Sequence, residues 1–338
     1  DTLSFRNKIV NGAMQINQRG TRTAGTSNGY YACDRWRTFL WDIGTYTIQQ
    51  DTDAPEGFKY SLKWDCTTAD TSVAAGSRIG VRYILEGDDL QDLKYGTSNA
   101  ESTTLSFWIK STVTGTAAVR FKNLNSGGTK IIGQNVTISA ANTWEKKTVT
   151  IAGDTAAAIE GGNGPEYEIF IFFNAGTNYT SGAVPTSWEA DTDADLAAGA
   201  NIAINNSTSN NIWLTGVQWE KGTTATDFEH KSYGDDLIRC ERYYQIKGGY
   251  GGLCASASVA YLGGSLNPTM RSAPAIGQTA ALAVNDNNVN ATQSSTGLAS
   301  ADANVDGFFI AANNFSSLTS SNPCLMKVAG KLTFDAEM

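Results

Sequence analysis

The sequence is poor in the residues that hydrolytic catalysis and metal binding most often use. It has one histidine in 338 residues, His230, so any Ser–His–Asp or Cys–His arrangement would have to recruit that residue. His230 lies in FEHKSYG, where we expect a packing histidine, and a histidine-rich metal site is excluded by the count alone. The five cysteines are odd in number, and no pair has metal-ligand spacing. We therefore expect free thiols in a protein that folds in a reducing cytoplasm.

Long apolar runs and basic clusters are also scarce. No stretch approaches the about 18 uninterrupted apolar residues of a membrane span. Lys and Arg number 25 against 33 Asp and Glu, for a net charge of -8, and no basic stripe is present. This charge balance argues against a nucleic-acid partner. The opening DTLSFRNKIVNGA is unlike a signal peptide, and because it lacks an initial Met we expect a trimmed or partial chain.

Glycine, aromatic residues and two-residue periodicity are what the sequence has in abundance. It contains 34 Gly, 13 Tyr, 13 Phe and 8 Trp, a composition typical of strands joined by tight turns. Apolar residues alternate with polar ones in many short segments, which predicts strands with one buried face. These segments include FKYSLKW (58–64), RIGVRYIL (78–85), LSFWI (105–109), and the pairs Val119 with Phe121 and Val149 with Ile151.

Three further segments refine the β interpretation. YEIFIFF (167–173) is almost wholly apolar, as in a strand covered on both faces. IWLTGVQW (212–219) changes phase around Gly216, which predicts a bulge. The long, polar and acidic segment 174–200 predicts an exposed loop that interrupts a sandwich or jelly roll.

One segment, 232–245, has helical rather than strand periodicity. Ser232 and Asp235 have the spacing of a capping box, and Leu237, Cys240 and Tyr244 then form an apolar stripe. We expect a short helix that separates two β domains. The fold class predicted is all-β: a jelly-roll sandwich over 1–231, a helical collar over 232–245, and a smaller β domain over 246–338.

Motifs at both ends of the first predicted domain resemble a family of bacteriophage tail-fibre and related virion proteins. NKIVNGAMQINQRGT (7–21) and DRW (34–36) match its opening, and GVQWEKGTTATDFEHKSY (216–233) matches the close of its sandwich. The run CERYY (240–244) and the segment LNPTMRSAPAI (266–276) resemble its helix and its C-terminal domain. The resemblance implies a virion protein made in the host cytoplasm.

The sandwich also resembles jelly-roll carbohydrate-binding modules, which implies glycan binding. Some of those modules hold a structural calcium ion near their joined first and last strands, and Gln15 and Glu220 are the matching positions. Gln15 replaces the usual acidic residue, which removes a charged oxygen ligand. We therefore expect no cofactor, with calcium at Glu220 as the one open alternative.

Exposed aromatic residues are the candidates for glycan contact, because sugar rings stack on indole and phenol faces. Tyr179 and Trp188 lie in the predicted loop 174–200, and Trp108 alternates onto the face opposite Leu105 and Phe107. Paired carboxylates of the kind that hydrolyse glycosides lie in segments that the sequence predicts to be solvated. These acids are Asp88 with Asp89, and Glu189 with Asp191 and Asp193.

The resulting expectation is a non-enzymatic virion structural protein, a tail fibre or receptor-binding appendage that contacts host-surface glycan. One alternative is a capsid- or tail-associated protein that binds only other virion proteins. Another is a polysaccharide depolymerase. We also expect a homotrimer, with Leu237, Cys240 and Tyr244 at its interface, because a helix of about three turns must bury its apolar stripe. Packing of that stripe against its own chain is the alternative.

Overall fold

The computed structural model describes residues 5–125, 127–327 and 330–338. The chain is almost entirely β and divides into two compact units. Unit 1 comprises Asp1–Asp236 with Met338, and unit 2 comprises Leu237–Glu337. The predicted all-β class, with a jelly-roll sandwich, a short helix and a smaller β domain, describes this architecture. No helix in the described part of the chain is long and apolar enough to cross a membrane.

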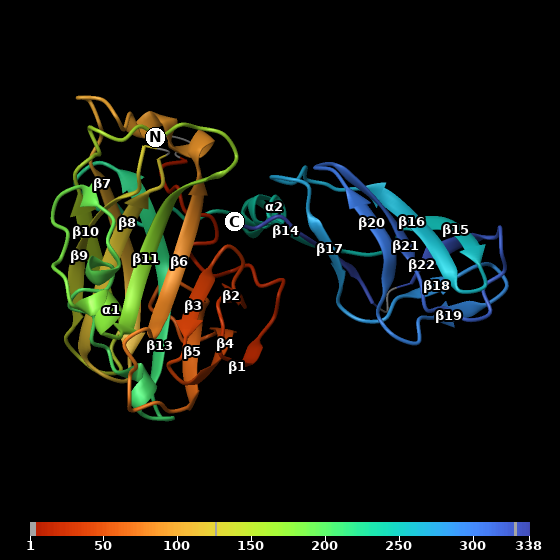
Figure 1. Ribbon diagram of the computed structural model, residues 1–338, viewed down its shortest axis with the longest axis horizontal. Coiled ribbons are helices and arrows are strands. Elements are labelled where there is room, and N and C mark those ends of the chain that lie inside the picture. The colour runs from red at the N-terminus through yellow and green to blue at the C-terminus, as the bar shows by residue number, and fades with distance from the viewer. Residues whose placement is uncertain (1–4, 126, 328–329) are drawn as a thin grey trace. The chain divides into compact units, whose positions relative to one another are not determined.

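Unit 1 is a sandwich of two antiparallel sheets that face each other (Figure 1). Sheet A consists, in spatial order, of β1 (Arg22–Gly25), β4 (Thr45–Asp51), β5 (Ser61–Thr68), β13 (Asn211–Lys221), β7 (Thr103–Ser111) and β10 (Glu145–Ile151). Sheet B consists of β12 (Glu189–Ala190), β9 (Lys130–Ile138), β8 (Gly115–Asn123), β11 (Pro165–Ala175), β6 (Arg78–Glu86), β3 (Arg37–Trp41) and β2 (Gly29–Tyr30). Both sheets combine hairpin neighbours, such as β4 with β5, with neighbours from distant parts of the sequence, such as β13 with β5, as expected of a jelly roll.

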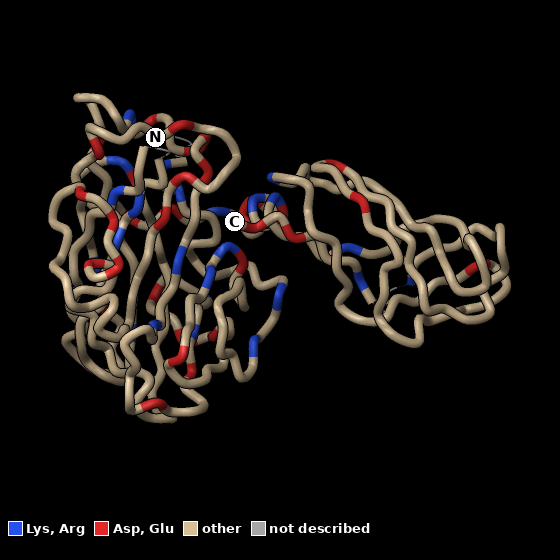
Figure 2. The backbone as a smooth tube through the Cα atoms, in the orientation of Figure 1, with Lys and Arg blue, Asp and Glu red and all other residues tan. Residues whose placement is uncertain are grey.

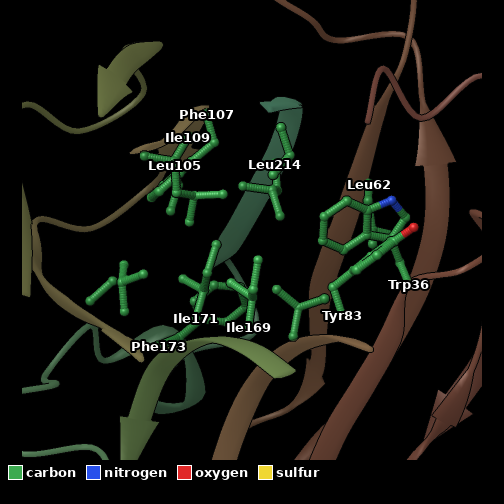
Figure 3. Close-up of a cluster of buried hydrophobic side chains, with 14 of the residues drawn as sticks. Trp36, Leu62, Tyr83, Leu105, Phe107, Ile109, Ile169, Ile171, Phe173 and Leu214 are labelled. Atoms are coloured by element: carbon green, nitrogen blue, oxygen red, sulfur yellow. The ribbon is translucent and has the colours of Figure 1, made fainter. Parts of the chain in front are cut away.

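The core of unit 1 lies between the two sheets and is built by the alternating residues that the sequence indicated. Figure 3 shows ten of these side chains converging from both sheets: Trp36, Leu62, Tyr83, Leu105, Phe107, Ile109, Ile169, Ile171, Phe173 and Leu214. Each is at most 4% exposed. Burial of this much apolar surface is the main stabilising contribution to the sandwich.

The opening motif and the DRW motif interlock beneath the sandwich edge. The Asn11 side chain accepts a hydrogen bond from the Ile16 amide and donates to the carbonyls of Ile16 and Asp34. The Asp34 carboxylate accepts two hydrogen bonds from Gln18, at 2.9 and 2.6 Å. Trp36 donates its indole N–H to the Asn11 carbonyl at 3.0 Å. Both motifs thus have a structural role, because they satisfy the polar groups of a buried chain reversal.

The predicted bulge around Gly216 is confirmed. The β13–β7 register shifts between Thr215 and Gln218, and Gly216 has φ +60°. A Cβ atom there would lie 2.6 Å from the Phe58 ring and 2.9 Å from the Trp108 ring. Glycine is therefore required both by the left-handed backbone and by the close approach of two aromatic side chains.

Segment 174–200 is not the exposed loop that its composition predicted. It contains α1 (Thr177–Thr180), the sheet-B strand β12 and the 3₁₀ turn η2 (Asp193–Asp195). Leu196, Ala197 and Ala200 are buried in a second apolar cluster on the outer face of sheet B. The prediction failed because Phe170 and Phe172 of β11 point away from the main core and must be covered.

The helix predicted over 232–245 is shorter than expected. Helix α2 spans Tyr233–Glu241. The Ser232 hydroxyl accepts a hydrogen bond from the Asp235 backbone N–H, as predicted for the N-terminal cap of this helix. Tyr244 instead begins strand β14 (Tyr244–Lys247), which pairs with β23 (Leu332–Asp335). Cys240 is fully buried and Tyr244 is 7% exposed within a single chain. The predicted trimer interface is therefore corrected: Cys240 and Tyr244 are buried within their own chain, and of the three residues only Leu237 keeps part of its surface exposed.

Unit 2 contains two antiparallel sheets around its own apolar core. The three-stranded sheet consists of β14, β23 and β17 (Ala275–Gln278). The seven-stranded sheet consists of β19 (Asn290–Thr292), β18 (Ala283–Asn285), β22 (Pro323–Met326), β15 (Gly251–Ser256), β16 (Val259–Ser265), β21 (Gly307–Ala312) and β20 (Leu298–Ala303). All five cysteines of the chain are buried free thiols, as expected: Cys33, Cys66, Cys240, Cys254 and Cys324.

Candidate functional site

The outer face of sheet B carries a groove of about 210 Å³ over strands β3, β6 and β11. We call this hollow the sheet-B groove. Its lining is formed by Asn28, Arg37, Phe39, Arg78, Arg82, Lys122, Glu168, Phe170, Phe172, Asp193 and Leu196. Four basic and two acidic side chains thus meet three phenylalanines on one surface of an otherwise acidic protein.

Strand alternation explains why these residues share a face. On β6, Ile79, Val81 and Tyr83 enter the core, so Arg78 and Arg82 point outward. The register then sets Arg37 of β3 directly opposite Arg82, and Phe170 of β11 on the other side of Arg82.

Three phenylalanines form the floor of the sheet-B groove. Phe39 and Phe172 have ring centroids 4.6 Å apart, and Phe170 stacks on Phe172 at 5.6 Å with an interplanar angle of 18°. Gly80 lies between them, and a Cβ atom there would be 2.3 Å from the Phe39 ring and 2.2 Å from the Ile171 carbonyl oxygen. The missing side chain leaves room for the Phe39 ring, which is tilted by 54° against the Phe172 ring, and the three rings give the groove an apolar base.

Three guanidinium groups and the ammonium group of Lys122 form the basic part of the lining. Arg82 forms an ion pair with Glu168 at 2.9 Å, and Lys122 forms one with Asp191 at 2.5 Å. Burial lowers the pKa of Arg82, and the like charges of Arg37 and Arg78 act in the same direction against the opposing effect of Glu168. Burial also raises the pKa of Glu168, against the attraction of Arg82. Within the described residues, no carboxylate lies in ion-pair range of Arg37 or Arg78.

Arg120 holds the wall of the sheet-B groove. Its side chain is fully buried, donating Nε–H to the Asp195 carbonyl at 3.1 Å and an Nη2 proton to the Ala198 carbonyl at 2.9 Å. These bonds fix the chain that carries Asp193 and Leu196 to the groove. Burial lowers the pKa of Arg120 to about 10, opposed by the charge of Asp195. The side chain therefore acts as a structural clamp.

Trp41 at the end of β3 was not singled out from the sequence. It is 59% exposed, and its register partner is Arg78. The signal was present in RTFLW (37–41), where Thr38 and Leu40 are fully buried and the other three residues alternate onto the outer face of sheet B. Trp41 lines a separate hollow with Thr26 and Asp42, and it adjoins the sheet-B groove through its register partner Arg78.

Tyr179, a predicted glycan-contact residue, lies next to the sheet-B groove. Its ring packs against the apolar cluster under segment 174–200, and the Arg78 guanidinium lies 4.7 Å from the ring centroid. The cation–π contact places Tyr179 at the side of Arg78 rather than in the lining of the groove.

Trp188, the other predicted loop residue, packs inward. Its indole N–H donates to the Ala152 carbonyl at 2.8 Å. Its ring meets Tyr95 and Tyr167 edge-on, with centroids 6.0 and 6.3 Å away, and packs against the main core. The prediction assumed that segment 174–200 was solvated throughout, so it overlooked this anchoring role.

We expect Trp188→Ala to lower the free energy of unfolding by about 1–3 kcal/mol, less than full burial would give because the side chain is half-exposed. Chemical denaturation monitored by circular dichroism measures this loss. Trp41→Ala is the matched control, with an expected change below about 1 kcal/mol because its ring is largely solvated. An unchanged denaturation midpoint for Trp188→Ala would show that Trp188 does not anchor the segment and would favour its predicted role in glycan contact.

Trp108 lies on the outer face of sheet A, away from the sheet-B groove. It is half-buried beside Gly216 and pairs in register with Thr215 and Lys146. Its neighbour Trp213 is only 7% exposed, because Lys63 and Lys110 lie over its ring at 5.3 and 4.5 Å. The two tryptophans on the outer face of sheet A, Trp108 and Trp213, are thus largely covered by the protein's own side chains.

Glu220, the candidate calcium ligand, is only 2% exposed and is surrounded by donors. It accepts hydrogen bonds from the Thr226 amide, the Thr226 hydroxyl and the Gln218 amide group, and the Arg6 guanidinium lies 3.7 Å away. A calcium site needs several oxygen ligands and no adjacent cation, so this donor set does not fit the ion. In the described part of the chain no group of three or more metal-ligating side chains is present.

No protein-family profile and no curated protein sequence matches this chain. Solved structures that it resembles include a xylan-binding domain of Paenibacillus barcinonensis, at 12% identity and TM-score 0.31, covering 56% of this chain and 92% of that one. They also include a family 11 carbohydrate-binding module of Clostridium thermocellum, at 8% identity and TM-score 0.30, covering 60% and 99%. An N-terminal cellulose-binding domain of Cellulomonas fimi shows 15% identity and TM-score 0.28, covering 56% and 90%. At these values the neighbours carry no argument about the ligand.

Proposed function

We propose that this chain is a non-enzymatic appendage protein of a bacteriophage virion, and that the sheet-B groove of unit 1 binds glycan on the host surface. The observation that carries glycan binding is the exposed indole of Trp41 on the same face of sheet B as Arg37 and Arg78, two guanidinium groups with no ion-pair partner among the described residues. Sugars bind to proteins through such groups, because the C–H faces of a sugar stack on aromatic rings and its hydroxyl oxygens accept hydrogen bonds from N–H donors. The virion assignment rests on the resemblance of the opening and boundary motifs.

A direct binding experiment tests this proposal. The full chain is applied to an array of bacterial surface polysaccharides and to the intact cells from which these were purified. We expect retention on at least one polysaccharide and on its cells. Retention on none of them, together with co-purification with capsid or tail proteins, would instead favour the alternative role as a protein that binds only virion partners.

The absence of catalysis is part of the same proposal. Asp88 and Asp193 are already hydrogen-bonded or lie at the surface, and His230 is exposed beside the rings of Phe58 and Phe228. We expect no new reducing ends when the purified protein is incubated with a polysaccharide that it binds. Turnover that disappears on substitution of one acidic residue would establish a depolymerase.

We also propose that the chain assembles as a homotrimer, at a surface other than the Leu237–Cys240–Tyr244 stripe. Unit 2 exposes large apolar side chains on one face of its seven-stranded sheet: Leu253, Tyr261, Phe309 and Leu325, between 41% and 57% exposed. Few charges interrupt these strands (Figure 2). Exposed apolar faces of this kind mark association surfaces. Light scattering on the full chain should give three times the mass of one chain, and a monomer at micromolar concentration would contradict the assembly.

A further inference from the structure

We propose that the sheet-B groove selects anionic saccharides, in which carboxylate, sulfate or phosphate groups on the sugar bind the guanidinium groups of Arg37 and Arg78. This inference rests on the proposed glycan function and adds the chemical class of the ligand. It predicts that the negative group, rather than the sugar ring alone, determines which glycans bind.

The charge balance of the groove supports this class of ligand. The chain as a whole has a net charge of -8, yet the groove lining has four basic side chains against two acidic ones. Glu168 compensates Arg82, and Asp191, which lies outside the lining, compensates Lys122. Arg37 and Arg78 have no ion-pair partner among the described residues, and Asp193 is the one further carboxylate of the lining, so the balance remains positive. A local positive potential on an acidic protein attracts anions to that place.

The arrangement of the arginines is costly without an anion. Arg37 and Arg82 are direct cross-strand partners, and like charges in that relation destabilise a sheet. One carboxylate, Glu168, lies against this pair, and it is bonded to Arg82. An anionic ligand would compensate the second positive charge, and a guanidinium binds a planar carboxylate or an oxyanion with two parallel N–H donors.

The aromatic groups restrict the ligand to a sugar rather than a free inorganic anion. The Phe39–Phe170–Phe172 floor offers an apolar base below the arginines, and Trp41 is the register partner of Arg78. The three phenylalanines are at most 8% exposed, so the surface for sugar C–H faces is the exposed indole of Trp41 beside the arginines. A hexuronate, a sialic acid or a sulfated sugar combines such a C–H face with a negative charge.

The test uses matched pairs of polysaccharides and the full chain. Polygalacturonate and its carboxyl-reduced form differ only in the carboxylate, and dextran sulfate and dextran differ only in the sulfate. Sialyllactose and its carboxyl methyl ester form a third pair, and the array polysaccharide that the chain retains is compared with its carboxyl-reduced or dephosphorylated form. We expect at least tenfold tighter binding of the anionic member of every pair that binds, and weaker binding as salt rises.

Charge variants identify the groove as the cause of this selectivity. Arg37→Gln and Arg78→Gln should each weaken binding of the anionic glycan about tenfold or more and reduce its dependence on salt. Glu168→Gln should strengthen that binding, because it removes the carboxylate that competes with the ligand for Arg82. Lys146→Gln, at an exposed position of sheet A, removes the same unit of charge and should leave binding unchanged.

The outcomes separate this inference from the function on which it rests. Equal binding of neutral and anionic members, with loss of binding in Trp41→Ala, would contradict anion selectivity and leave glycan binding in place. Binding of free sulfate or phosphate as tightly as the glycan would contradict the role of Trp41 in binding the sugar ring. Retention of no glycan at all would contradict the proposed function itself.

Discussion

Replacing Arg120 by Met should lower the free energy of unfolding of unit 1 by about 3–5 kcal/mol. Methionine keeps much of the volume but removes every donor from a fully buried site. The carbonyls of Asp195 and Ala198, together with the Asn135 side chain, would each lose a charged hydrogen-bond partner. Urea denaturation followed by tryptophan fluorescence measures the change.

The same substitution should release segment 174–200 from sheet B. Hydrogen exchange at the amides of Leu196 and Ala197 should then accelerate more than exchange in β6, which lies elsewhere in the sheet. Arg22→Met is the control, since that arginine is exposed in edge strand β1 and should change stability by no more than about 0.5 kcal/mol. An Arg120 variant as stable as the control would show that this side chain does not clamp the segment.

The double variant Trp41→Ala with Arg78→Gln should weaken glycan binding by about 3–5 kcal/mol, roughly 100-fold or more. The two residues face each other across β3 and β6, so their loss removes both the exposed stacking surface and one guanidinium donor. Stability should remain nearly unchanged, because Trp41 is 59% exposed and Arg78 is partly exposed. Calorimetric titration with the retained polysaccharide measures the loss of affinity.

The chain itself offers a matched control for this experiment. Trp108 and Lys146 form the equivalent aromatic–basic pair across β7 and β10 of sheet A. Trp108→Ala with Lys146→Gln should leave affinity within about twofold of the parent protein. If the control variant lost binding and the sheet-B variant kept it, the site would lie on sheet A, as the sequence interpretation of Trp108 implied.

Alternation of apolar residues predicted the sandwich because it reports directly which side of a strand is buried. It located β6, β7 and β11, and the phase change at Gly216 located the bulge. The same pattern could not say what covers the second apolar face of β11. The composition of segment 174–200 therefore led to the wrong expectation of a solvated loop, although its Leu196 and Ala197 complete the layer.

The candidate site was harder to predict because it depends on register between distant strands. Arg37 and Arg82 are 45 positions apart, and only the β3–β6 pairing brings them face to face. The composition of the long loop predicted exposed aromatic side chains there, but Trp188 is anchored by its hydrogen bond to the Ala152 carbonyl. The RTFLW strand contained the missed residue, Trp41, in a position that alternation alone marks as outward.

The end of the helical stripe was misplaced for a similar reason. Leu237, Cys240 and Tyr244 fit helical spacing, but a strand partner from the far end of the chain competes for the last of them. The backbone of Tyr244 pairs opposite Asp335. Local periodicity contains no information about a strand partner that lies nearly one hundred residues away in the sequence.

Indole N–H signals in a two-dimensional ¹H–¹⁵N spectrum of the full chain test the central claim most directly. Each signal is assigned by a single Trp→Phe variant, and the chain is then titrated with the polysaccharide that it retains. If glycan binds in the sheet-B groove, the Trp41 signal should shift in proportion to the bound fraction, while the signals of Trp108 and Trp188 stay in place. A titration that shifts Trp108 or Trp188 and leaves Trp41 unmoved would contradict glycan binding in the sheet-B groove.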